Sequence, residues 1–78
     1  MSTNYEVALD VLAYCPDSYE AFVGAHDYNV DAATDALISG AVAAGWFLDP
    51  ADAAVAVEPA TRPLVREVLA YAFASAVL

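Results

Sequence analysis

The sequence contains no lysine, and its two arginines, Arg62 and Arg66, lie four positions apart near the C-terminal end. Residues 1–61 therefore carry ten acidic side chains and no lysine or arginine. A protein that binds DNA or RNA directly must neutralise phosphates with Lys and Arg side chains. The sequence accordingly predicts no direct contact with nucleic acid.

Cysteine and histidine each occur once, as Cys15 and His26. One cysteine excludes an intrachain disulfide, and the pair is too small a set to form a zinc site. Catalysis by a nucleophile also needs a base and a group that orients it. Cys15 falls on the apolar side of its segment and His26 in a turn, so nothing indicates that they meet. We therefore expect no enzyme activity, no catalytic residue, no metal and no cofactor.

The segment from Asp27 to Ile38 begins like a helix–loop–helix calcium site, with Asp27, Asn29 and Asp31 at alternate positions. Such a loop needs glycine at its sixth position and a bidentate glutamate at its twelfth. Those positions hold Ala32 and Ile38. The pattern favours a capped turn with acids at a helix N-terminus over a calcium site.

Long apolar runs are also missing. The two longest uncharged runs, residues 36–48 and 68–78, fall short of the about 20 residues that a membrane-spanning helix needs. The N-terminal segment shows neither the basic region nor the apolar region of a secretory signal. With a single cysteine as well, we expect a cytoplasmic protein with no membrane partner.

Alanine-rich segments with apolar residues at helical spacing dominate the sequence, and none alternates with the period of a strand. Capping patterns predict helices that follow Thr3, Asn29 and Asp49, with others opening at Pro16 and at residues 61–63. The third helix ends at Gly40 or continues to Phe47. We expect one all-α domain over residues 1–78, a bundle of four to five short helices.

Apolar positions at three- and four-residue spacing predict the inner faces. In the first helix they are Tyr5, Ala8, Leu9, Val11, Leu12 and Cys15; in the third they are Val30, Ala33, Leu37, Ile38 and Ala41. Trp46 and Phe47 are predicted to be core residues rather than contact residues.

A net charge of −9 is the strongest compositional feature. Several of the acidic side chains lie four residues apart, and each such like-charge pair destabilises an isolated helix by about 0.2–0.5 kcal/mol. A GC-rich or salt-adapted genome would explain the acidity without a function. A negative face for a basic partner would explain it with one. The residues that this second interpretation predicts as contacts are Glu6, Asp10, Asp27, Asp31 and Asp35.

These features predict a small acidic protein-binding module. A phage-encoded or bacterial inhibitor or regulator that docks on a basic, nucleic-acid-binding protein as a nucleic-acid mimic fits them. A rival hypothesis is a structural subunit that forms a homo-oligomer through the Ala/Gly-rich third helix and the apolar C-terminal helix.

Residues Val7 to Ile38 resemble the three-helix ubiquitin-associated and CUE domains. The exit from the first helix, "AYCPD", and the third helix, "YNVDAATDALI", carry the resemblance. In those families a loop after the first helix and a leucine pair in the third contribute to the ubiquitin-binding surface. The resemblance implies that Tyr14–Pro16 and the pair Leu37 and Ile38 form a partner-binding face of an adaptor.

Overall fold

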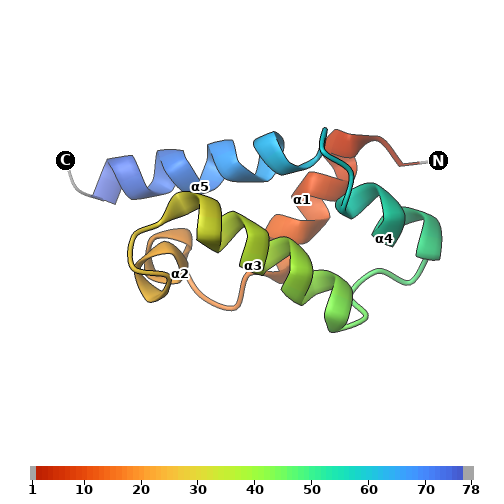
Figure 1. The fold of residues 1–78 in the computed structure, drawn as a ribbon, viewed down its shortest axis with the longest axis horizontal. Coiled ribbons are helices and arrows are strands. Elements are labelled where there is room, and N and C mark those ends of the chain that lie inside the picture. The colour runs from red at the N-terminus through yellow and green to blue at the C-terminus, as the bar shows by residue number, and fades with distance from the viewer. Residues whose placement is uncertain (1, 77–78) are drawn as a thin grey trace.

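The computed structural model describes residues 2–76, and these form five helices and no strand (Figure 1). The helices are α1 (Asn4–Tyr14), α2 (Tyr19–Ala25), α3 (Val30–Ala43), α4 (Pro50–Ala56) and α5 (Arg62–Ala76). Helix α5 lies along one edge of the molecule and packs on α1, α2 and α3, while α4 packs mainly on α1. The prediction of an all-α bundle of four to five helices is confirmed.

Local capping explains where most helices begin. Thr3 and Glu6 form a capping box, in which the Thr3 hydroxyl accepts from the Glu6 N–H at 3.1 Å. The Asn29 and Asp49 side chains cap α3 and α4, as predicted, by accepting from the Ala32 and Ala51 N–H groups. The start of α2 is a correction: Ser18, not Pro16, precedes the helix, because the Ser18 hydroxyl accepts from the Ala21 N–H at 3.2 Å.

Helix α3 ends at neither of the two predicted positions. Gly40 lies inside the helix, and a Cβ at this position would meet the Tyr14 ring at an ordinary contact distance of 3.5 Å. The helix ends at Ala43, and Gly45 then adopts φ +69, a left-handed conformation that ends many helices. The Trp46 N–H returns to the Ala41 carbonyl at 3.1 Å, which turns the chain toward α4.

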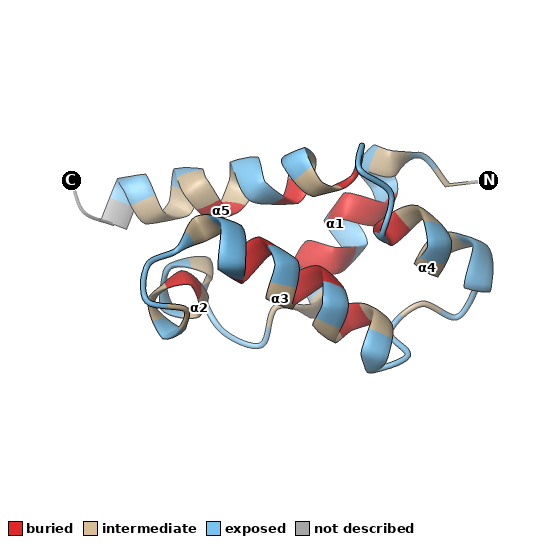
Figure 2. Cartoon of the chain, viewed as in Figure 1, coloured by how far each residue is buried: buried red, intermediate tan, exposed pale blue. Residues whose placement is uncertain are grey.

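The buried residues lie where α1, α3 and α5 face one another (Figure 2). The inner face of α3 is as predicted, apart from the added Thr34, which is 0% exposed, and Val30, which is only partly buried. The inner face of α1 is partly wrong. Tyr5 and Leu9 are 62% and 48% exposed, and Val7 is fully buried instead.

One buried threonine ties the joint between α4 and α5 to α1. Thr61 is 0% exposed, and its hydroxyl donates to the Val55 carbonyl at 2.7 Å. The same oxygen accepts from the Asn4 side-chain amide at 3.0 Å, and that amide also donates to Glu58 at 2.9 Å. The Thr61 hydroxyl therefore joins the start of α1 to the end of α4, 57 and 6 residues away in sequence.

Candidate protein-binding surface

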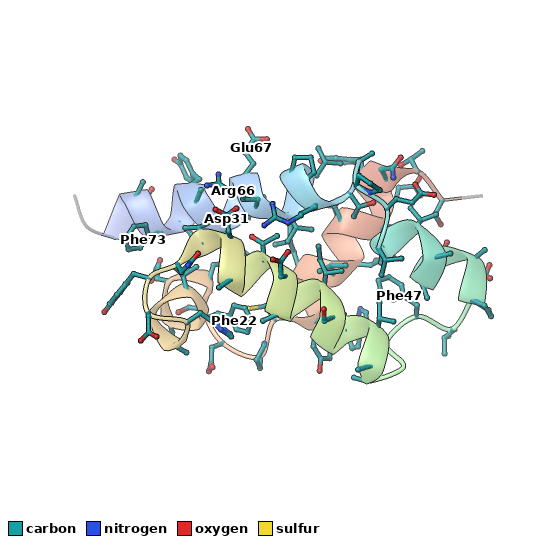
Figure 3. The ribbon with its side chains drawn as sticks, viewed as in Figure 1. Phe22, Asp31, Phe47, Arg66, Glu67 and Phe73 are labelled. Carbon is teal, nitrogen blue, oxygen red and sulfur yellow. The ribbon has the colours of Figure 1, made fainter. Side chains whose placement is uncertain are left out.

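The two arginines are held by two of the predicted contact residues. One Asp31 carboxylate oxygen lies 2.7 Å from Arg66 Nε and 3.1 Å from an Arg62 terminal nitrogen. Asp35 lies 2.7 Å from Arg62 Nε. Figure 3 shows Asp31 and Arg66 side by side where α3 passes α5. The cluster therefore fastens α3 to α5 across the surface.

These contacts change the ionisation of the groups involved. The hydrogen bonds from Arg66 and Arg62 lower the pKa of Asp31, since they favour its charged form. The hydrogen bonds to Asp35 and Asp31 raise the pKa of Arg62. Asp31 and Asp35 thus have an internal role in addition to any external one. The sequence analysis did not predict this pairing, although the equal spacing of four residues in Asp31 and Asp35 and in Arg62 and Arg66 was a signal that could have suggested it.

The other three predicted acidic contacts are exposed and separate into two places. Glu6 and Asp10 lie one turn apart on the outer face of α1, although Glu6 also takes part in the capping box. Asp27 lies in the turn between α2 and α3, where it and Tyr28 have φ 59 and 61. The Tyr28 ring packs on Phe73, with centroids 5.7 Å apart, and this contact helps to hold that unusual backbone.

Leu37 and Ile38 lie in the core. They are 1% and 8% exposed, and they pack against the buried residues of the neighbouring helices. A partner could reach the Leu37 side chain only if the bundle opened. In this conformation the pair does not provide the exposed contact that the sequence interpretation required.

The connection between α3 and α4 exposes two large apolar side chains, Trp46 and Leu48. A pocket of about 350 Å³, here named the Trp46 surface, is lined by Asp10, Trp46, Phe47, Leu48, Asp49 and Asp52. Trp46 is 46% exposed and Leu48 is 99% exposed. The prediction that Trp46 and Phe47 are both core residues is therefore wrong for Trp46, whereas Phe47 packs against the core.

Trp46 is fixed in position although it is exposed. Its indole Nε1 donates to the Asp10 carbonyl at 2.9 Å. Its ring meets the edge of Tyr14, with centroids 5.5 Å apart and planes at 61°. An aromatic side chain that is already ordered loses little conformational entropy on binding. The sequence signal that could have identified it was the run of apolar residues directly before the Asp49 cap.

A second groove lies between α3 and the joint of α4 and α5, with a volume of about 420 Å³. Its lining residues are of mixed charge: Asp35, Ile38, Ser39, Ala56, Val57, Glu58, Pro59 and Arg62. Arg62 in this groove is already paired with Asp35. The groove therefore lacks the uniform charge of the Trp46 surface.

The groups considered for catalysis or metal binding have ordinary surroundings. Burial raises the pKa of the Cys15 thiol, which keeps it protonated and weakly nucleophilic. The His26 ring packs on Phe22, with centroids 4.8 Å apart. Within residues 2–76, no group of three or more His, Cys, Asp or Glu side chains is arranged to hold a metal ion. None of the described helices is both long and apolar enough to cross a membrane.

Comparison of the chain with models of protein families, with curated proteins and with solved structures finds no match.

Proposed function

We propose that this chain is a small acidic protein-binding module that docks on a basic partner, such as a nucleic-acid-binding protein that it inhibits or regulates. One observation carries the proposal. Ion pairs within residues 2–76 engage Asp31 and Asp35, which leaves nine of the eleven acidic side chains without an arginine partner. Both cations of the chain act internally, so the outward field is negative.

A surface of this kind suits fast and selective association with a basic protein. Complementary potentials accelerate encounter and exclude partners of the same sign. Their effect is screened over a Debye length of about 8 Å at physiological ionic strength. The proposal therefore predicts that binding weakens as salt is added, mainly through a slower association rate.

The rival hypothesis of self-association has less support. Small residues of α3 serve contacts within the chain: Ala41 is 0% exposed, and Gly40 lies against Tyr14. Two copies that each carry a net charge of −9 would also repel one another. Sedimentation equilibrium at low and high salt separates the hypotheses. We expect a monomer at low salt, and an oligomer that forms regardless of salt would favour a structural subunit.

The proposal is tested by selecting binders from a random peptide library displayed on particles, with the intact chain as bait. We expect the selected peptides to be enriched in Lys and Arg and to be released by added salt. Selection of neutral or acidic peptides, or of none, would contradict the proposal. Selection of no peptide is the outcome expected if the acidity reflects only the composition of the genome.

A further inference from the structure

We propose that the Trp46 surface is the docking site, and that its occupant is a basic segment of the partner with one bulky apolar side chain flanked by Lys or Arg. This inference rests on the proposed function and adds the site and the chemistry of the ligand. The Trp46 surface combines exposed apolar side chains with carboxylates.

The apolar half of the argument is the exposure of Leu48. A leucine that is 99% exposed contributes almost nothing to the core, and its burial by a partner is favourable in proportion to the apolar area removed from water. Trp46 beside it is both exposed and held in place by Asp10 and Tyr14. Tryptophan in such a position is enriched among the residues that dominate binding energy. A pocket of about 350 Å³ accepts a bulky side chain.

The charged half is the set of carboxylates around the pocket. Asp10 comes from α1, whereas Asp49 and Asp52 come from the start of α4. Asp49 uses one oxygen to cap α4, at 2.9 Å from the Ala51 N–H, and so keeps the other for a ligand. The arginines are bound to Asp31 and Asp35 and do not line this pocket. Cationic groups on both sides of an apolar anchor would therefore meet uncompensated negative charge.

The surface continues along the outer face of α1. Glu6 and Leu9 are exposed on the same helix as Asp10, and side chains three or four residues apart on a helix are neighbours. Acidic and apolar side chains thus extend the pattern of the pocket beyond it. A second copy of this chain would bring a like pattern of acids to the site, so charge complementarity favours a basic partner instead.

The apolar contact is tested with Leu48→Ala and the matched control Val57→Ala. Both side chains are exposed, and Val57 lines the other groove. The probe is the tightest cationic peptide from the library selection, titrated by fluorescence anisotropy. We expect Leu48→Ala to weaken binding about tenfold, because it removes most of the apolar area that the partner would bury at this position. We expect Val57→Ala to leave binding unchanged. If Val57→Ala weakens peptide binding and Leu48→Ala does not, the peptide binds in the other groove and the inference is overturned.

The charged contact is tested with two double variants that change the net charge equally. Asp10→Asn with Asp52→Asn removes two carboxylates of the Trp46 surface, whereas Asp17→Asn with Glu67→Gln removes two exposed carboxylates outside it. Glu67 points away from the molecule on the outer side of α5 (Figure 3). We expect the first double variant to bind the peptide about tenfold more weakly than the second. Equal losses would mean that only the overall charge matters, which overturns the proposed site.

The outcomes separate this inference from the function on which it rests. If cationic peptides are selected but neither Leu48→Ala nor the Asp10 and Asp52 variant weakens them more than its control, the module binds basic partners at another site. If no cationic peptide is selected, the proposed function itself fails. Circular dichroism of each variant shows whether the fold is retained, and Leu48→Ala is the decisive variant because its side chain is almost wholly exposed.

Discussion

Replacing Thr61 by valine tests how the joint of α4 and α5 is held to α1. Valine matches threonine in shape but removes two hydrogen bonds, to the Val55 carbonyl at 2.7 Å and from the Asn4 amide at 3.0 Å. Each hydrogen bond contributes about 0.5–1.5 kcal/mol net. The partners keep other contacts, since Val55 still accepts from the Glu58 N–H and Asn4 still donates to the Glu58 carboxylate. We therefore expect a loss of about 1–3 kcal/mol in the free energy of unfolding.

For a domain of this size, 1 kcal/mol corresponds to about 4–8 °C in melting temperature. Thr34→Val is the matched control, because Thr34 is also 0% exposed but donates only to the Val30 carbonyl of its own helix, at 2.7 Å. That carbonyl lies on the main-chain ladder of α3, so the control should change stability by less than about 0.5 kcal/mol. Urea denaturation of both variants gives the comparison. Equal losses would refute the bridging role of Thr61.

The remaining predictions concern a pair of glycines and the ion-pair cluster. Gly45→Ala should destabilise the protein by about 1–2 kcal/mol, because alanine is strained at the φ of +69 that this residue adopts. Gly40→Ala should stabilise it by about 0.5–1 kcal/mol, because alanine favours the helix and its Cβ would meet Tyr14 at an ordinary 3.5 Å. Thermal melts in which Gly45→Ala is the more stable variant would contradict both expectations. The pKa of Asp31 is lower in the folded protein than in the unfolded chain, so the unfolded chain binds a proton at Asp31 more readily. The contribution of Asp31 to stability is therefore present above the ordinary Asp pKa of about 3.9. It is lost as the pH falls through the lower pKa of the folded state. The difference in unfolding free energy between the wild type and Asp31→Asn should therefore shrink as the pH falls below the pKa of Asp31 in the unfolded chain. A difference that grows in acid would contradict the stabilising role of the Asp31 ion pairs.

The helices were largely predictable because their starts are encoded locally. Thr3 with Glu6, Asn29, and Asp49 with Pro50 satisfy backbone N–H groups within a few residues of themselves. Ser18 was missed because Pro16, two residues earlier, offered a competing start. Capping patterns state where a helix can begin, and the choice between adjacent patterns depends on packing.

The candidate site was less predictable, because exposure depends on how the helices pack. Tyr5 and Leu9 have the spacing of an inner face, but α1 turns Val7 inward instead. Asp31 looks like a free carboxylate in the sequence and is bound by arginines more than thirty residues away. Trp46 looks like a core residue, yet it lies half exposed on a turn. Each of these errors concerns a tertiary contact that spacing along one helix cannot specify.

The most direct test of an acidic docking surface is to map where a basic ligand binds. The measurement is an NMR titration of the ¹⁵N-labelled protein with the selected cationic peptide, in which the chemical shifts of the backbone amides and the Trp46 indole are monitored. The account predicts that the largest changes fall on the Trp46 indole, Leu48 and Asp10, and that they fade as salt is added. Changes centred on Arg62 and Arg66, or none at any residue, would contradict it.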